Sequence, residues 1–554
     1  MKTKITLLSE FFWQNKKIII TAFLFGFLSI VTTILIPVFL GKYYQIALHS
    51  HSARGKLFDF LFGKLSGIKT YFICFSSLIL SKFFFDFLMK YYLGITGELF
   101  SKSIRESLFS RQLNVKFDLY QKKETGLYLL RYSGDLSAIQ HYLTKGIITF
   151  VNDCLHLVLA LFLLAFLNLK LTLIVLASYP IIFLSILFLN KKLKLITGKR
   201  RNIRSSNLSF VSARLNSLLT IKAFNRQSIE NDKYSKRSTE LYTFGKKYYW
   251  LYSLIFALLP FMLYSMLAII LLVAYDIKQT NINKIHGHDL LTFIMTIVNI
   301  IPVLKRILGV NFVWQAGDIS FTKLLKVFNT EQETVGNNEK QEITSGSVVF
   351  NKVAFGYLNG YPIFNNLSFD IPSDSLTLIS GKHQTGKSTL FKLILGLYEV
   401  DNGEIIIGGL NISNCNKQIL RKKVTIMSDE FPLIGKSIFE TISYSRKIEK
   451  RLPAFLMLQK LGYLKSNEDE TILDNPIFEN GKNISFSQRK ILLLARALLT
   501  NKKILLLDEP FEGLDKEFVK IIAKVIAEYK LNHTVIVIDR NRNDLLKYDL
   551  EIYL

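Results

Sequence analysis

The stretch Gly381-Lys382-His383-Gln384-Thr385-Gly386-Lys387-Ser388 decides the fold of the C-terminal part of this chain. Two glycines with four residues between them, followed by Lys and Ser, fit the phosphate-loop spacing. The residues before the loop (375–380) predict a strand, and those after it (387–395) predict a helix. Glycines let backbone N–H groups curl around phosphate oxygens, and a helix N-terminus adds partial positive charge. The sequence therefore predicts a nucleotide site in which Lys387 reaches the β- and γ-phosphates and Ser388 holds Mg²⁺.

The composition indicates that part of the chain lies in a membrane. Of the 554 residues, 50% are hydrophobic, and the mean hydropathy is positive, which is rare in a soluble chain of this length. The net charge of +27 fits either nucleic-acid binding or the basic cytoplasmic segments of a membrane protein. No basic–aromatic platform or base-reading helix stands out, so we expect no nucleic-acid partner. The three cysteines have no metal-ligand spacing and are expected to be reduced, and we expect no cleaved signal peptide.

Six apolar stretches are each long enough to cross a bilayer. They cover residues 18–40, 71–93, 147–167, 171–189, 250–273 and 290–308. The third and fourth are joined by Asn168-Leu169-Lys170 alone, which predicts a tight helical hairpin. Pro180, Pro260 and Pro302 lie inside spans and predict kinks.

Few charged groups occur inside these spans. Lys82 and Asp86 are four residues apart and share one helix face, so we expect them to pair with each other rather than to contact a substrate. Asp153 and His156 stand near the start of the third span, and a structural role is favoured for the histidine. No specific role follows for any of the four.

The distribution of basic residues predicts the topology. Two long polar stretches, 97–145 and 191–249, carry most of the Lys and Arg and are expected to form cytoplasmic loops. An even number of spans then places both termini in the cytoplasm, although the outward segment 49–69 is also basic. The predicted domains are a transmembrane domain (1–327), a polar linker (328–345) and a soluble α/β domain (346–554).

A second nucleotide-site element follows the phosphate loop. Residues 504–508 form an all-apolar run that ends in two acids, as a buried parallel strand would. Asp508 at its end is expected to hold Mg²⁺ through water. Glu509 is expected to orient or deprotonate the attacking water.

With these motifs in place, the chain resembles an exporter-type half-transporter of the ATP-binding cassette superfamily over nearly its whole length. Residues 117–126, 133–139 and 218–226 resemble the family's coupling regions, and 402–409, 479–481 and 512–515 match other family segments. The resemblance implies an all-α six-helix transmembrane bundle followed by an α/β P-loop NTPase domain in a bacterial inner or plasma membrane. It also implies ATP and Mg²⁺ as cofactors and a dimer as the working unit.

The resemblance extends the candidate site beyond the phosphate loop. The ATP contacts it implies, together with those of the loop, are Tyr357 (stacked on adenine), Gly381, Lys382, His383, Gln384, Thr385, Gly386, Lys387, Ser388, Thr389, Ser485, Ser487, Gln488, Asp515 and Arg540. The candidate metal ligands are Ser388, Asp508 and Asp429. The candidate catalytic residues are Glu509 and Lys387.

Three positions depart from the family pattern. Ile484-Ser-Phe-Ser-Gln488 stands in place of Leu-Ser-Gly-Gly-Gln, so the Cβ of Ser487 crowds a close approach to phosphate. Asp429 replaces a Gln and would repel a nearby γ-phosphate. Arg540 replaces a His, and it can stabilise phosphate charge but cannot act as a neutral hydrogen-bonding switch.

These departures predict a chain that binds ATP and hydrolyses it slowly at its own site. A heterodimer with a less altered half-transporter is preferred, and a working homodimer is the alternative. A regulatory or structural subunit with negligible hydrolysis is a third hypothesis. Membrane lipid is an expected partner, but the exported substrate (peptide, lipid or drug) does not follow from the sequence.

Overall fold

The computed structural model describes residues 3–47, 68–121, 131–279, 287–333, 342–357, 361–382, 384–464, 468–478, 481–540 and 542–554. They form two compact units. The helical unit comprises Met1–Leu113 and Lys123–Thr330, and the α/β unit comprises Asn114–Lys122 and Glu331–Leu554.

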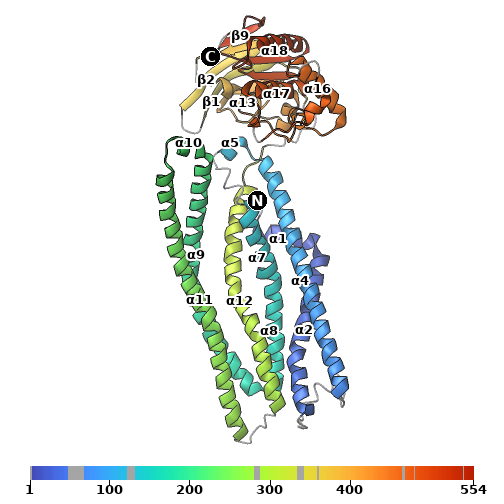
Figure 1. Ribbon diagram of the computed structural model, residues 1–554, viewed down its shortest axis with the longest axis vertical. Helices are drawn as coiled ribbons and strands as arrows, with labels where there is room; N and C mark the ends of the chain where they lie inside the picture. The colour runs from blue at the N-terminus through green and yellow to red at the C-terminus, as the bar shows by residue number, and fades with distance from the viewer. Residues whose placement is uncertain are drawn as a thin grey trace. The chain divides into compact units, whose positions relative to one another are not determined.

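The helical unit consists mainly of long helices that run roughly alongside one another (Figure 1). In chain order its elements are α1 (Lys4–Gln14), α2 (Lys16–Ala47), α4 (Ile68–Leu113), η2 (Arg131–Asp135), α7 (Leu136–Leu143), η3 (Thr144–Thr149), α8 (Phe150–Leu167), α9 (Leu169–Asn216), α10 (Leu218–Ala223), α11 (Gln227–Gln279) and α12 (Gly287–Phe328). Helix α12 joins two hydrophobic cores. Phe293 and Ile297 pack into the core shared with α8, α9 and α11, whereas Phe321 and Leu324 pack into that shared with α1, α2, α4 and α7.

Five helical segments of the described residues are long and apolar enough to cross a membrane. They are Lys16–Ile46, Ile68–Leu113, Leu136–Leu167, Gln227–Asp276 and Gly287–Phe328. Five of the predicted spans fall inside them, and the predicted span 171–189 lies in α9. The predicted tight joint is confirmed, because Asn168 alone separates α8 from α9. Its side chain accepts a hydrogen bond of 3.2 Å from the N–H of Leu171 and so caps α9.

The basic stretches differ from the expected loops, because most of their described residues are helical. Helix α4 continues to Leu113, α9 to Asn216, and α11 begins at Gln227. The stretch 191–249 contains no proline and is rich in Lys and Arg, which favour helix. Pro180, Pro260 and Pro302 lie inside helices that each keep a single assignment across them.

The α/β unit contains two sheets. A five-stranded parallel sheet has the order β6-β7-β8-β3-β9, and a four-stranded antiparallel sheet has the order β2-β1-β4-β5. The strands are β1 (Val348–Tyr357), β2 (Tyr361–Ile371), β3 (Leu376–Ser380), β4 (Asn402–Ile407), β5 (Leu410–Asn411), β6 (Val424–Met427), β7 (Ile504–Asp508), β8 (Thr534–Ile538) and β9 (Leu550–Tyr553). The predicted strands at 375–380 and 504–508 are confirmed as β3 and β7. Parallel strands buried on both faces are expected to be apolar throughout, and the first four residues of β7 are fully buried.

Helices and short turns complete the α/β unit. They are α5 (Phe117–Gln121), α13 (Lys387–Ile394), α14 (Lys417–Lys423), α15 (Ile438–Ser443), η4 (Ile448–Lys450), α16 (Arg451–Lys460), η5 (Glu470–Asp474), α17 (Phe486–Leu499), α18 (Lys516–Tyr529) and η7 (Lys530–Asn532). Helix α5 belongs to this unit by its contacts, because the ring of Phe117 packs edge-on against Tyr398 with centroids 5.7 Å apart. The Nζ of Lys116 lies 3.3 Å from carboxylates of Glu331 and Glu399. Part of the predicted linker, 334–341, lies outside the described residues.

Candidate functional site

The phosphate loop connects β3 to α13, as predicted. Gly386 has φ +90°, and a Cβ there would lie 2.4 Å from the side chain of Ile363, so this position requires glycine. The Nζ of Lys387 donates hydrogen bonds of 2.7 Å to the carbonyls of Gly381 and Lys382. The lysine ammonium is thus held within the turn of its own loop. Thr385 also bonds the Lys382 carbonyl at 3.1 Å, and His383 lies outside the described residues.

Tyr357 ends strand β1 next to the helix that follows the phosphate loop. Its hydroxyl lies 3.2 Å from Oγ1 of Thr389 in α13. Its ring meets the ring of Tyr398 edge-on, with centroids 5.2 Å apart. Thr389 and Tyr398 therefore hold the side chain in place from two sides, while 37% of the residue stays exposed. An aromatic ring in that state is suited to stack on a flat base.

Asp508 ends strand β7 and meets the phosphate-loop serine. Ser388 and Ser428 both donate hydrogen bonds to its carboxylate, the latter at 3.0 Å. Burial raises the pKa of Asp508 to about 6, and the nearby charges of Glu509 and Glu430 act in the same direction, while the two serines oppose them. Mg²⁺ is commonly held by one or two protein oxygens together with nucleotide phosphates. The hydroxyl of Ser388 and the carboxylate of Asp508 fit that donor set.

Glu509 is held in an unusual backbone conformation and is paired with Arg540. Its φ of +46° is in the left-handed region, which costs a non-glycine residue about 1 kcal/mol. Its N–H donates to the carbonyl of Ile538 at 2.8 Å. The Nε of Arg540 donates to Oε1 of Glu509 at 2.9 Å. Burial acts to raise the pKa of Glu509, but hydrogen bonds with Glu512 and Arg540 outweigh it and leave the pKa below its usual value.

The Ile484–Gln488 segment opens helix α17. Ser485 is its N-cap, and the side chains of Ser485 and Gln488 bond each other's backbone N–H groups at 3.1 and 3.0 Å. The hydroxyl of Ser487 donates to the carbonyl of Gly513 at 3.2 Å. Asp515 is the N-cap residue of α18. Ser487, predicted to stand at a phosphate, is thus turned toward the segment after Glu509.

Asp429, which follows strand β6, lies beside Arg489 of helix α17. Its carboxylate is 3.8 Å from Nε of Arg489, and its carbonyl accepts a bond of 3.1 Å from the same guanidinium. The neighbouring Glu430 pairs with Lys392 of α13 at 2.7 Å. A role of Asp429 in binding Mg²⁺ stays a prediction.

One residue of this region was missed by the sequence analysis. Lys490 is buried, and its Nζ donates to the carbonyls of Glu509 and Glu512 at 2.6 and 2.8 Å. It thereby ties α17 to the segment that carries the candidate base. A signal was present, because Lys490 shares a helix face with Leu494 and Leu498, which are apolar and buried.

Comparison with protein families gives matches to both parts of the chain. Residues 19–300 match the model described as ABC transporter transmembrane region, and residues 364–512 match the model described as ABC transporter. The chain belongs to the ABC transporter family. One helical membrane region fused to one ATP-binding domain is the organisation of an exporter-type half-transporter, as the resemblance implied.

Individual relatives of this ABC transporter are distant but match over most of their length. The chain is 25% identical to an ATP-dependent lipid A-core flippase of Haemophilus influenzae over 456 residues, covering 82% of this chain and 78% of the flippase. It is 26% identical over the same length to the flippase of Pasteurella multocida, with the same coverage. The structure of a bacterial Atm1-family ABC exporter with ATP bound aligns with a TM-score of 0.85 at 19% identity, covering 97% of this chain and 93% of that one. The last comparison establishes the fold.

Two ion pairs connect charged side chains that lie inside the predicted spans of the transporter. The predicted Lys82–Asp86 pair is confirmed at 2.7 Å, and Ser29 of α2 bonds both side chains. Asp153 of α8 pairs with Arg306 of α12, the shortest distance being 2.6 Å. His156 is buried. These pairs fit a structural role in joining helices.

Proposed function

We propose that this ABC exporter chain is the partly degenerate half of a heterodimer, which binds ATP-Mg²⁺ well and cleaves it slowly at its own site. The observation that carries the proposal is the Arg540–Glu509 ion pair at 2.9 Å. A general base acts best when its carboxylate is unpaired and its pKa is not depressed. Arg540 engages the carboxylate, and the pKa of Glu509 lies below its usual value.

A different set of residues supports the proposed binding of ATP-Mg²⁺. Ser388 and Asp508 supply oxygen ligands for Mg²⁺, Lys387 stands at the phosphate loop, and Tyr357 offers a partly exposed ring. These groups serve ground-state binding. ATP-driven closure of two such domains would switch the helical bundle between inward- and outward-facing states. In this proposal both termini and the ATP-binding domain are cytoplasmic.

A lipid is the cargo we propose, because the curated relatives matched over most of the chain are named for the transport of lipid A-core. A lipid cargo also places substrate in the same bilayer that the apolar helices would cross. The alternative cargoes, peptide and drug, are separated from it by transport of labelled substrates into inverted vesicles.

A working homodimer is the second candidate. It is favoured by the complete set of Lys387, Asp508 and Glu509, and by Ser485, which keeps its hydroxyl at the N-cap of α17. In that case Arg540 would leave Glu509 when ATP and a second domain bind. A regulatory subunit is the third hypothesis. Such a subunit would require no ATP hydrolysis at this site, and transport would not depend on the site.

The test is Mg-ATPase turnover of the purified full-length chain in lipid nanodiscs, alone and with candidate partner half-transporters. We expect slow turnover alone, little affected by Glu509→Gln, and fast turnover with the correct partner. Robust turnover of the chain alone that is abolished by Glu509→Gln would sink the heterodimer proposal. For the regulatory alternative, Lys387→Ala is introduced into the complex. Unchanged transport by that variant would show that this site is not needed for the power stroke.

A further inference from the structure

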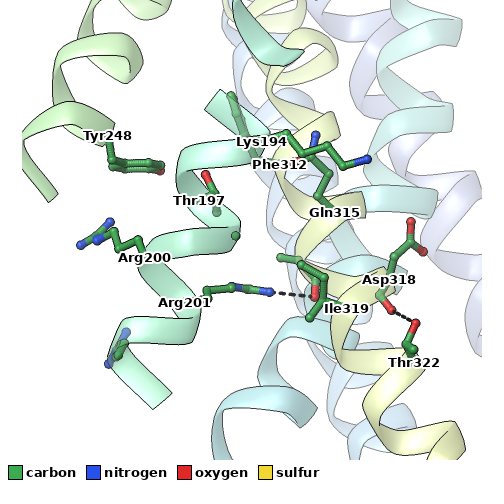
Figure 2. Close-up of a pocket in the computed structure, with 13 residues that line it drawn as sticks. Lys194, Thr197, Arg200, Arg201, Tyr248, Phe312, Gln315, Asp318, Ile319 and Thr322 are labelled. Atoms are coloured by element: carbon green, nitrogen blue, oxygen red, sulfur yellow. Dashed lines mark hydrogen bonds between the residues drawn. The ribbon is translucent and has the colours of Figure 1, made fainter. Parts of the chain in front are cut away.

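A cavity of about 440 Å³ lies in the helical unit among α9, α11 and α12 (Figure 2). Its volume is in the range of sites for small molecules. The basic residues that line it all come from α9: Lys194, Arg200, Arg201 and Arg204. Tyr248 of α11 and, from α12, Phe312 and Ile319 add aromatic and aliphatic surface. The cavity thus combines a strongly cationic wall with an apolar one.

The cations of this wall have no carboxylate partners in the described part of the chain. No Asp or Glu oxygen there lies within 4.0 Å of the charged groups of the four α9 residues. The one acidic residue that lines the cavity, Asp318 of α12, is paired with Lys4 of α1. Uncompensated positive charge at a partly enclosed site is costly, and a bound anion relieves that cost.

Two of the guanidinium groups are held in place by the cavity walls. Arg201 reaches across to α12, where its Nη1 lies 3.5 Å from the carbonyl oxygen of Ala316 (Figure 2). This is one long bond for a group with five N–H donors, so most of its donors stay available. Arg200 lies over the ring of Tyr248, 4.9 Å from the centroid. Stacking positions a guanidinium without using its hydrogen-bond donors.

The position of the cavity along the helices favours a lipid over a free anion. Its lining begins a few residues beyond the predicted ends of the spans at 189 and 308, and Tyr248 precedes the predicted span that starts at 250. By the predicted topology this is the level at which cytoplasmic lipid headgroups lie. The apolar residues Phe312 and Ile319 would then face the part of the molecule next to its headgroup.

We propose that this cavity binds the phosphate headgroup of an anionic lipid before it is moved across the membrane. The inference rests on the proposed lipid-export function and specifies the substrate class. Arg200 and Arg201 hold the phosphate oxygens through paired N–H donors, for which guanidinium geometry is suited. Lys194 and Arg204 add charge, and Tyr248, Phe312 and Ile319 contact the adjoining apolar part.

The experiment measures equilibrium binding to the purified full-length chain in non-ionic detergent, without ATP. The probe is a fluorescent short-chain phosphatidic acid. The same tails carrying a phosphatidylcholine headgroup test charge, and inorganic phosphate competes as the free anion. The test variant is Arg200→Gln/Arg201→Gln. The matched control is Lys191→Gln/Lys199→Gln, which removes the same charge from exposed α9 positions that do not line the cavity.

The expected result is saturable binding of the phosphatidic acid, weaker binding of the phosphatidylcholine, and little competition by millimolar phosphate. The cavity variant should weaken binding on the order of tenfold per lost guanidinium, which corresponds to about 1.4 kcal/mol each, because charge-assisted hydrogen bonds to the phosphate are lost. Arg200→Lys/Arg201→Lys should retain part of the affinity and shows that the fold tolerates change at these positions. An equal loss in the control variant, or equal binding of both headgroups, would overturn the proposal.

Two further outcomes distinguish failure of the proposed headgroup site from failure of the proposed lipid-export function. Full competition by inorganic phosphate would identify a small anion as the ligand and overturn the lipid assignment. Headgroup-selective binding combined with no ATP-driven lipid transport would retain the site and reject the proposed function. Because the assay contains no ATP, a slow nucleotide site does not affect it.

Discussion

The Nε of Arg540 lies 2.9 Å from Oε1 of Glu509, although the two residues are 31 positions apart in the chain. The pairing follows from the sheet. Strands β7 and β8 are parallel neighbours with Asp508 opposite Ile538, so the residues that follow the two strands come together. The same guanidinium lies 3.6 Å from a carboxylate oxygen of Glu512. One cation is thus shared by two acids at the place where the attacking water is expected.

Replacing Arg540 with His should speed hydrolysis. The variant removes the permanent charge, so the pKa of Glu509 should rise toward its usual value and the carboxylate becomes a better base. We expect turnover at pH 8 to increase on the order of tenfold, a modest part of what a positioned base contributes. The measurement is steady-state Mg-ATPase of the full-length chain with its partner.

Arg542→His is the matched control for this prediction. Arg542 is a nearby arginine that forms an ion pair with Glu551, at 2.9 Å. Its substitution should leave turnover unchanged. If both variants raise turnover equally, general charge rather than the Glu509 pair is responsible.

The pKa of Asp508, about 6, predicts a pH dependence of Mg²⁺-assisted nucleotide binding. Above pH 6 the carboxylate is ionised and can hold the metal, and below pH 6 it is protonated and cannot. Because the folded-state pKa is raised, ionisation costs the folded state stability as pH rises through 6, and bound Mg²⁺ should offset this cost. The enhancement of ATP affinity by Mg²⁺ should therefore fall as pH drops from 7 to 5.

Ser428→Ala tests whether Asp508 is the group whose titration sets the midpoint pH of this fall in the Mg²⁺ effect. The hydroxyl of Ser428 bonds the carboxylate at 3.0 Å and opposes the rise of the pKa. Its removal should move the midpoint to higher pH. The exposed Ser413→Ala serves as the control. A midpoint that stays in place in Ser428→Ala would assign the titration to another group.

Local sequence patterns were enough to predict the parts of the site whose residues are contiguous in the chain. The phosphate loop lies between β3 and α13, and Asp508 ends a buried strand, as spacing and hydrophobicity predicted. The Arg540–Glu509 contact could not be predicted in this way, because it depends on β7 and β8 being neighbours. A list of strands does not give their order.

Two other differences between the predicted and the observed fold have separate causes, one of them long-range contacts and the other local helix propensity. Residues 114–121 pack within the α/β unit because Phe117 meets Tyr398 and Lys116 meets Glu399, and both contacts join residues almost three hundred positions apart. The basic stretches were expected to be loops because polarity was used as the signal. Residues of high helix propensity without proline continue a helix whether or not it is buried.

Lys490→Met should destabilise the protein. Methionine fits a side chain of similar length, but it leaves the carbonyls of Glu509 and Glu512 without the donor that bonds them now. Loss of a charged donor to these part-buried acceptors costs about 1.5–3 kcal/mol. The measurement is the thermal unfolding temperature of the full-length chain in detergent. Lys520→Met, an exposed change on α18, should be neutral, and equal unfolding temperatures for the two variants would contradict the proposed tie.

Tyr357 is predicted to contribute stacking to nucleotide affinity. Truncation in Tyr357→Ala removes the ring and should weaken binding by about 1–3 kcal/mol, the usual range for stacking of a base on an aromatic side chain. In Tyr357→Phe the ring is kept and only the contact with Thr389 at 3.2 Å is lost, so the effect should be within about threefold. Affinity is measured with a fluorescent ATP analogue under conditions without turnover, so slow hydrolysis does not enter. Tyr553→Ala, an exposed tyrosine of β9, is the control. Binding by Tyr357→Ala that equals that of the control would show that the adenine lies elsewhere.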